Sequence, residues 1–254
     1  MKTMFKAMLV AMLVFTMVQP VVFAAEPTQE EVVASSPVKL IKAQLIDNHY
    51  YYTLSGQVEI INIAFKKQVA ITWNGDAAGG LIEANYKMPL ENGHELWTFK
   101  TNINKVNVGE KGLTFAIRFK TAGKTFWDNN NYADYTLDAD MNNVVLGNRN
   151  VAVEASTFDW TENAVNGTVI VRNLGYPKTV KITYTTDRWI TKKVAFAKFT
   201  ETLGDANNSD NVERWTFKLP VDTNAKNVEY AVAYTVNKKT YWDNNNLINY
   251  IDHR

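Results

Sequence analysis

A pattern of two adjacent aromatic residues, an aspartate and three asparagines occurs twice in this chain. Residues 124–131 read Lys-Thr-Phe-Trp-Asp-Asn-Asn-Asn, and Tyr135 follows four residues later. Residues 239–246 read Lys-Thr-Tyr-Trp-Asp-Asn-Asn-Asn, with Tyr250 at the same spacing. Because an internal repeat usually marks a duplicated structural unit, the chain is predicted to contain two copies of one module.

Further segments recur in the same order in the two copies. Each alternates apolar with polar residues, and glycine, asparagine or aspartate separates one from the next. Period-two alternation that is rich in β-branched and aromatic residues predicts strands with one buried face. The matched segments are residues 56–62 with 167–173, 67–73 with 178–184, 97–100 with 215–218, and 115–119 with 230–234.

The fold class follows from the number of these strands. Several short strands in a unit of about 100 residues are typical of an immunoglobulin-like β-sandwich. We therefore predict an all-β protein with two tandem immunoglobulin-like β-sandwiches, over residues 38–137 and 151–254. Residues 138–150, rich in asparagine and aspartate, are interpreted as a linker.

The first 25 residues differ in character from the rest. Lys2 and Lys6 flank the start of an almost unbroken apolar stretch over residues 7–18, which Pro20 ends before small residues at 22–25. This order predicts a secretory signal peptide over residues 1–25 and a secreted protein. The alternative, a membrane anchor, fits less well because the apolar run is shorter than the ~20 residues that a spanning helix needs. Residues 26–37 have little apolar content and are predicted to form a flexible leader.

Composition narrows the classes of partner. The chain has 254 residues, no cysteine and a formal net charge of +1, so removal of Lys2 and Lys6 leaves +1 − 2 = −1. Without cysteine there are no disulfides and no thiolate metal sites, and in an exported protein this favours a bacterial source. No run of Lys or Arg is present, which argues against nucleic acid as a partner. We expect a monomer with no membrane span after processing.

Catalytic patterns are missing from the sequence. Glycoside hydrolases need two placed carboxylates, and no glutamate of one copy has an obvious catalytic counterpart in the other. His49, His94 and His253 have no metal-ligand spacing. No nucleophile elbow or phosphate loop is present. The protein is therefore predicted not to be an enzyme and to use no catalytic residue, metal or cofactor.

The repeated block suggests a ligand instead. Adjacent strand residues point to opposite faces, so Phe126 and Trp127, like Tyr241 and Trp242, cannot both face a core. An exposed indole suits the apolar face of a sugar ring, and asparagine amides both donate and accept, as sugar hydroxyls do. The alternatives are a core tryptophan and a plain asparagine turn. Three consecutive asparagines exceed the needs of a turn, which favours sugar binding.

These residues resemble the starch-binding domains of carbohydrate-binding module family 21, which occur in fungal glucoamylases and in glycogen-targeting subunits of protein phosphatase 1. The resemblance rests on the Trp-Asp-Asn-Asn-Asn-x-x-x-Tyr block, on Trp97-Thr-Phe99, and on Asn62-Ile-Ala-Phe-Lys-Lys67. It covers both copies. It implies an immunoglobulin-like β-sandwich whose ligand is an α-glucan: starch, glycogen or maltooligosaccharides.

The resemblance implies a first surface site made of two indoles and two amides. In the second copy the corresponding residues are Trp189, Trp242, Asn244 and Asn249. In the first copy only Trp127 and Asn129 correspond. Residues 76–80 lack the second tryptophan there, and Asp134 stands where the second amide belongs.

A second surface site is implied by the same resemblance. It uses an aromatic residue and a lysine, which correspond to Phe65 and Lys67 in the first copy and to Tyr176 and Lys178 in the second. A further aromatic corresponds to Tyr86, and in the second copy either Phe196 or Phe199 matches it. The alternative for Phe65 and Tyr176 is ordinary packing at a strand end.

Three functional hypotheses follow. The leading one is an exported, non-catalytic α-glucan-binding protein whose two weak modules gain apparent affinity when both engage one polymer. The second is an exported protein–protein interaction module that recruits an amylase, another exported glycosidase, or a cell-wall partner. An enzyme is the least favoured of the three.

Overall fold

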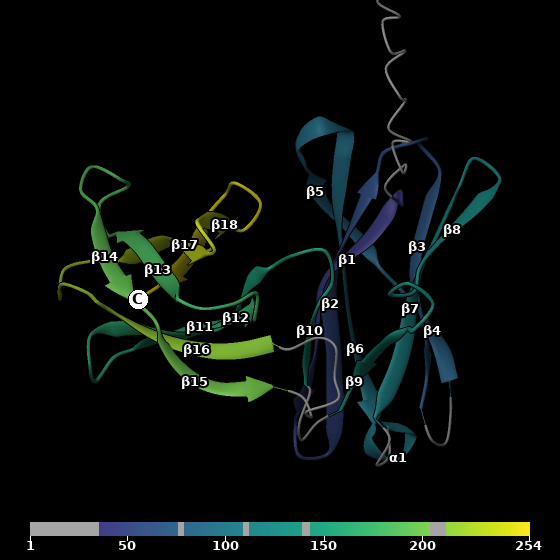
Figure 1. The fold of residues 1–254 in the computed structure, drawn as a ribbon, viewed down its shortest axis with the longest axis horizontal. Helices are drawn as coiled ribbons and strands as arrows, with labels where there is room; N and C mark the ends of the chain where they lie inside the picture. Colours follow the sequence, from purple (N-terminus) through teal and green to yellow (C-terminus); the bar gives the residue numbers. More distant parts are fainter. Residues whose placement is uncertain (1–35, 76–78, 109–111, 139–142, 204–211) are drawn as a thin grey trace, which may run out of the picture. The chain divides into compact units, whose positions relative to one another are not determined.

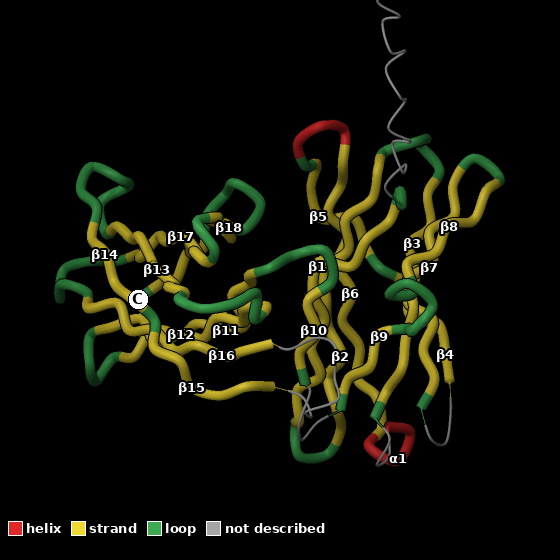
Figure 2. Tube along the Cα trace, viewed as in Figure 1, coloured by secondary structure: helices red, strands yellow, loops and turns green. Residues whose placement is uncertain are grey.

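Strands and turns make up nearly all of the described residues. The computed structural model describes residues 36–75, 79–108, 112–138, 143–203 and 212–254. Within these residues, helical structure is confined to η1 (Glu91–Gly93) and α1 (Lys105–Val108), so the predicted all-β class is confirmed (Figure 1; Figure 2). The expected signal peptide and most of the leader lie outside the described residues. No helix in the described ranges has the length and apolar character needed to cross a membrane.

The described part of the first sandwich contains ten strands. They are β1 (Val38–Asp47), β2 (Tyr51–Ile61), β3 (Lys67–Asn74), β4 (Gly79–Glu83), β5 (Asn85–Pro89), β6 (His94–Asn104), β7 (Leu113–Thr121), β8 (Lys124–Asp128), β9 (Tyr135–Leu137) and β10 (Val144–Leu146). One sheet has the order β10-β1-β2-β6-β5. The other has the order β4-β3-β7-β8, and β9 also pairs with β7.

The second sandwich repeats this plan. Its strands are β11 (Val151–Asp159), β12 (Ala164–Arg172), β13 (Lys178–Thr185), β14 (Lys193–Phe196), β15 (Lys198–Leu203), β16 (Val212–Pro220), β17 (Asn227–Val236), β18 (Lys239–Asp243) and β19 (Tyr250–His253). The sheets have the orders β11-β12-β16-β15 and β14-β13-β17-β18, with β19 paired to β17. Two sandwiches of matching topology confirm the predicted duplication.

Each copy has a glycine that lies directly against a phenylalanine ring of the neighbouring strand. Gly56 pairs with Phe99, and Gly167 pairs with Phe217. A Cβ at either glycine would lie 2.4 or 2.3 Å from the phenylalanine ring. Because real Cβ atoms do not approach so closely, only glycine lets each ring lie across the neighbouring strand.

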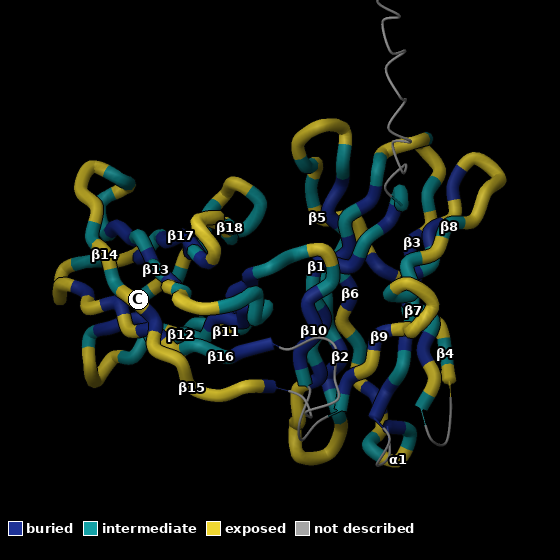
Figure 3. Tube along the Cα trace, viewed as in Figure 1, coloured by how far each residue is buried: buried dark blue, intermediate teal, exposed yellow. Residues whose placement is uncertain are grey.

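Each sandwich has its own apolar core. The first core includes Ile71, Phe115 and Phe119, and the second includes Ile182 and Tyr230. These residues occupy the alternate positions that the sequence pattern predicts to be buried. Exposed segments gather in the turns between the strands (Figure 3).

Part of the expected linker is a strand. Residues Val144–Leu146 form β10, which pairs with β1, while Ser36–Arg254 form one compact unit. Val145 packs in the first core, whereas its neighbours on β10 turn the other way. They form a third buried cluster with residues of the second sandwich, whose members are Val144, Leu146, Ala152, Ile170, Leu203 and Val212. The segment therefore buries apolar surface on both of its faces.

Candidate functional site

The two repeated tryptophans are surface residues. Trp127, on β8, is 48% exposed, and Trp242, on β18, is 56% exposed. Their neighbours Phe126 and Tyr241 pack against the two cores. The predicted alternation is confirmed, and each edge strand presents one indole to solvent.

An aspartate anchors each block to the first strand of its own sandwich. Asp243 Oδ2 accepts the Val153 N–H at 2.7 Å and the Tyr250 hydroxyl at 2.7 Å. Its Oδ1 accepts the Asn245 N–H at 3.2 Å. Burial, and then the charge of Asp243, raise the pKa of Tyr250 well above its ordinary value, so the hydroxyl keeps its proton and donates. Asp128 makes the equivalent bonds in the first copy.

The asparagine run is used largely by the turn itself. Asn244 Oδ1 accepts the Leu247 N–H at 3.0 Å, and Asn245 Nδ2 donates to the Asn249 carbonyl at 3.0 Å. Asn245 and Asn246 have φ angles of 52° and 59°, a left-handed conformation that asparagine tolerates. The first copy does the same. In each block two of the three asparagine side chains thus bond within the turn.

Amide groups remain for a ligand in each block. Within the described parts of the chain, Nδ2 of Asn244 has no acceptor, and neither has Nδ2 of Asn129. Each lies two residues after an exposed indole. The side chain of Asn249, which the resemblance assigns to the same site, is half-buried and likewise has no partner in the described ranges. Its main chain is fixed, because its N–H donates to the Asn244 carbonyl at 2.8 Å.

A second indole joins the site in the second sandwich. Trp189 lies in the loop between β13 and β14, where its φ of 67° places it in a left-handed turn. Its Nε1–H donates to Glu229 Oε2 at 2.8 Å, and its backbone N–H donates to Thr185 Oγ1 at 3.1 Å. Both contacts reach back to the sheet. The indole is thereby held against β17 and is not free to swing with the loop.

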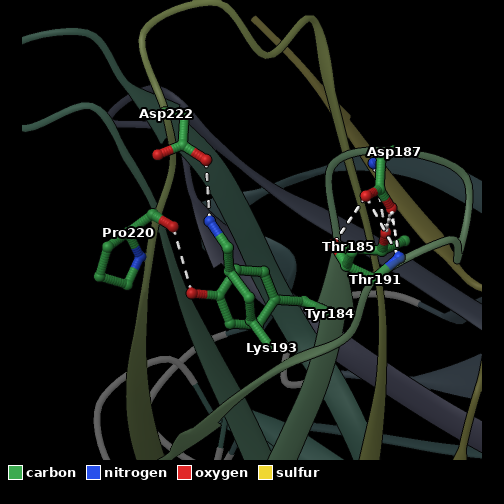
Figure 4. Close-up of polar contacts among 7 residues, drawn as sticks. All are labelled: Tyr184, Thr185, Asp187, Thr191, Lys193, Pro220 and Asp222. Atoms are coloured by element: carbon green, nitrogen blue, oxygen red, sulfur yellow. Dashed lines mark hydrogen bonds and ion pairs between the residues drawn. The ribbon is translucent and has the colours of Figure 1, made fainter.

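Asp187 organises the loop that carries Trp189 (Figure 4). Its carboxylate accepts the hydroxyl of Thr185 at 2.6 Å, and the hydroxyl and backbone N–H of Thr191 at 2.6 and 2.9 Å. The hydrogen bond from Thr185 has the largest effect, and together these bonds lower the pKa of Asp187 to about 2. The loop is therefore cross-braced by a carboxylate that stays ionised at neutral pH.

Strand register places the two indoles of the second sandwich on one face. Trp242 pairs with Ala233 across β17 and β18, and Glu229 lies four residues earlier on β17. Residues 229, 231 and 233 share the outward face because side chains alternate along a strand. Ala231 lies on this face between Glu229, which binds Trp189, and Ala233, which pairs with Trp242.

The first copy differs at the matching place. Trp127 pairs with Arg118 across β7 and β8, whereas Trp242 pairs with Ala233 in the second copy. The backbone N–H of Asp134 donates to the Asn129 carbonyl at 2.9 Å, so Asp134 occupies the turn position of Asn249 without an amide. Residues 76–78, where the second tryptophan is missing from the sequence, lie outside the described residues. The two copies thus share a frame but not a complete set of side chains.

The lysine of the second site is a buried structural residue. Lys67 Nζ is 2.7 Å from Glu95 Oε1 and donates to Asn62 Oδ1 at 2.7 Å. The other Glu95 oxygen accepts the Trp97 indole N–H at 3.0 Å. Lys178 makes the same set of contacts in the second copy. Each ammonium group is thus held by two protein partners, and these bonds connect the strands under the site.

Each of these two carboxylates belongs to a sequence segment that recurs in both copies. Glu95-Leu-Trp97 and Glu213-Arg-Trp215 are matching Glu-x-Trp segments in the two copies. Each glutamate lies two residues before a tryptophan on the same strand and therefore on the same face, which allows the indole bond. Comparison of the two segments indicates a shared role for the two glutamates, whereas their contact with the lysines depends on how distant strands pack.

The aromatic residues of the second site are exposed. Phe65 is 100% exposed and Tyr176 is 87% exposed, which rules out the alternative of ordinary strand-end packing. Tyr86 lies edge-on to Trp97, with ring centroids 6.1 Å apart. In the first sandwich, Phe65, Lys67 and Tyr86 line one shallow hollow with Trp97.

Register settles which aromatic matches Tyr86 in the second copy. Phe199 pairs with Trp215, as Tyr86 pairs with Trp97, and the rings are again edge-on at 6.0 Å. The same bulge follows each aromatic residue on its strand. Phe196 belongs to β14 in the other sheet, so the match is Phe199.

Comparisons with known proteins identify the family of the chain. A model of the carbohydrate/starch-binding module (family 21) matches residues 32–138 and again 145–252. The chain is 33% identical over 102 residues to glucoamylase 1 of Rhizopus oryzae, an alignment that covers 36% of this chain and 16% of the glucoamylase. It is 34% identical over 108 residues to glycogen-binding subunit 76A of Drosophila melanogaster, covering 41% of this chain and 16% of that protein.

A solved structure is also similar. It is the starch-binding domain of Rhizopus oryzae glucoamylase in complex with β-cyclodextrin and maltoheptaose, at 27% identity and a TM-score of 0.33, covering 42% of this chain and 96% of that domain. The chain spans less than a fifth of the length of either curated relative. The family model, in contrast, matches most of the chain in two stretches. The protein therefore belongs to carbohydrate/starch-binding module family 21 and carries two such modules in tandem.

Proposed function

We propose that this protein is exported and binds α-glucans, such as starch, glycogen or maltooligosaccharides, without cleaving them. One observation carries the proposal. In the second sandwich, the indoles of Trp189 and Trp242 lie on one outward sheet face, next to the free amide of Asn244. The names of the relatives, a glucoamylase and a glycogen-binding subunit, support an α-glucan as the ligand.

The binding mechanism combines stacking with a few directional bonds. The apolar faces of glucose rings stack on the two indoles, and each such aromatic contact contributes about 1 kcal/mol. Nδ2 of Asn244 donates to a hydroxyl. At the second site, Tyr176 and Phe199 offer aromatic surface that Lys178 supports from below. Every single site is weak, so tight retention needs several sites on one polymer.

Retention on insoluble starch tests the proposal. The full chain without its signal peptide is expected to stay on raw starch at micromolar concentration, and Trp242→Ala is expected to weaken binding about fivefold, equivalent to ~1 kcal/mol. Trp127→Ala is expected to have a smaller effect, because its site lacks a second indole. Trp160→Ala is the control, since Trp160 is exposed but belongs to neither site. A wild-type chain that remains in solution would overturn the proposal.

Export is tested separately. The supporting pattern is the sequence from Lys2 to Ala25, with its charged start, apolar stretch and small residues. N-terminal sequencing of protein recovered from the medium of a bacterial culture is expected to begin near Glu26. Protein that stays in the membrane fraction and keeps residues 1–25 would argue for an anchor.

Recruitment of a protein partner is the second candidate. Arg118 beside Trp127, and Asp134 in place of an amide, make the first block more charged than the second. A charged surface beside one exposed indole suits a protein contact as well as a sugar. Co-purification of an exported glycosidase in the absence of glucan, lost in Arg118→Ala, would favour this candidate.

A further inference from the structure

A cavity of about 280 Å³ opens beside the second repeated block and is lined from both sandwiches. Trp242 and Asn244 contribute from the second sandwich. The polar residues that line the cavity from before β11 are Lys42, Gln57, Glu59, Glu91, Asn92, His94 and Arg149. Its volume is near the ~300 Å³ lower end of ligand pockets, so it fits a short part of a ligand.

The wall from the first sandwich is polar and ordered. Glu59 Oε1 is 2.6 Å from His94 Nδ1, and Glu59 Oε2 accepts from Arg149 Nη2 and from Asn148 Nδ2, both at 3.1 Å. Burial opposes the charge of Glu59, but the bond from Asn148 and the charge of Arg149 lower its pKa overall. The amide of Gln57 has no hydrogen-bond partner in the described ranges.

A chain of contacts joins this wall to the block. Lys42, on β1, donates to the Val153 carbonyl, and the Val153 N–H donates to Asp243 Oδ2 at 2.7 Å. Burial lowers the pKa of Lys42, while Asp243 and Glu154 act in the opposite direction. Ala152, next to Val153, belongs to the buried cluster that includes Ile170. Indole and polar wall therefore belong to one compact unit.

The arrangement has the chemistry of a sugar site. An indole supplies a flat apolar face, and planar polar groups opposite supply donors and acceptors for hydroxyls. We propose that the first sandwich forms the second wall of the Trp242 site, where Gln57, His94 and Arg149 hydrogen-bond the α-glucan that stacks on Trp242. This inference rests on the proposed function. The Trp242 site is then a composite site formed by both modules, so residues of the first module contribute to the α-glucan affinity of the second.

The test is calorimetric titration of maltoheptaose into the full chain without its signal peptide. Trp127→Ala serves as the background, so that the first block does not contribute. Gln57→Ala and His94→Ala are each expected to weaken binding about threefold to tenfold, the range of one lost hydrogen bond. Thr168→Ala is the matched control, because Thr168 follows Gly167 as Gln57 follows Gly56 but does not line this cavity. It is expected to bind like the background.

The outcomes separate the two proposals. If the background chain does not bind maltoheptaose and wild type is not retained on starch, the proposed function fails. If Trp242→Ala weakens binding while Gln57→Ala and His94→Ala behave like Thr168→Ala, the composite site is overturned and the proposed function stands. An effect of Gln57→Ala that persists in Trp242→Ala also overturns it. Gln57→Ala breaks no described hydrogen bond, so this variant remains informative even where His94→Ala unfolds.

Discussion

Glu229 holds the indole of Trp189 through a hydrogen bond of 2.8 Å from Nε1 to Oε2. The ring sits on a loop, where side chains are ordinarily less restricted than on strands. Glu229 lies on β17, so the bond ties a loop residue to the rigid sheet. The Glu229 carboxylate thereby orients the indole of Trp189, and any effect on ligand binding comes through that indole.

Loss of this bond should weaken glucan binding. Glu229→Ala is expected to lower maltoheptaose affinity about threefold, because the freed indole must be ordered again on binding. Glu229→Gln keeps an acceptor oxygen and should rescue the affinity. Thr114→Ala, at the matching position of the first sandwich, is the control. Calorimetric titration measures all three, and a Glu229→Gln chain as weak as Glu229→Ala would show that charge, not orientation, matters.

The contribution of Asp187 to the stability of the folded chain should decrease as the pH is lowered. Its pKa is lowered from 3.8 to about 2 in the folded chain. A lowered pKa contributes stability above the unfolded value, and this contribution is lost as the pH falls from about 4 through about 2. Asp187→Asn should therefore be less stable than wild type at neutral pH, with the difference shrinking towards about pH 2. Urea unfolding across this range measures it, and a difference that does not change with pH would contradict the assignment.

The buried lysine of the second site should matter for stability before it matters for binding. The side chains of Lys178 and Glu213 are only 5% and 8% exposed. Lys178→Met leaves a buried carboxylate without its partner and should lower the free energy of unfolding by about 3 kcal/mol. Lys193→Met removes the surface partner of Asp222 (Figure 4) and should cost less than about 1 kcal/mol. A stable Lys178→Met chain with lost starch binding would instead indicate direct sugar contact.

Phe199 and Phe196 provide a test of the register. Phe199→Ala removes the ring that lies edge-on to Trp215 and should weaken retention on starch about threefold. Phe196→Ala, equally a loss of an exposed ring, should leave retention unchanged. Both are measured in a Tyr86→Ala background so that the first copy does not mask the loss. Equal effects would mean that the second site extends to β14.

Strand positions and the duplication were predictable from sequence because alternation reports which side chains are buried. The pairs Phe126–Trp127 and Tyr241–Trp242 show this, since one member of each packs and the other is exposed. Two matching copies strengthened each inference, because a chance pattern rarely recurs in order.

What the sequence left undetermined depends on pairing between distant segments. Lys67 looked like a surface residue, but Glu95 lies on another strand and buries its charge. Tyr86 had two candidate matches until strand register selected Phe199. Val144–Leu146 pairs with β1 of the first sandwich and packs against residues of the second. A three-residue strand gives almost no local sequence signal, so neither contact was predictable.

The buried cluster beneath β10 bears on how the duplication can change over generations. A spare copy of a module is usually free to drift or to be deleted. Here Ile170 of the second copy packs with Val144 and Leu146 in one buried cluster. Val144 and Leu146 lie on β10, which pairs with β1 of the first copy. A gene that lost either copy would uncover apolar surface on the remainder and invite aggregation. Once this cluster had formed, the pair could diverge in sequence but could no longer be separated without cost.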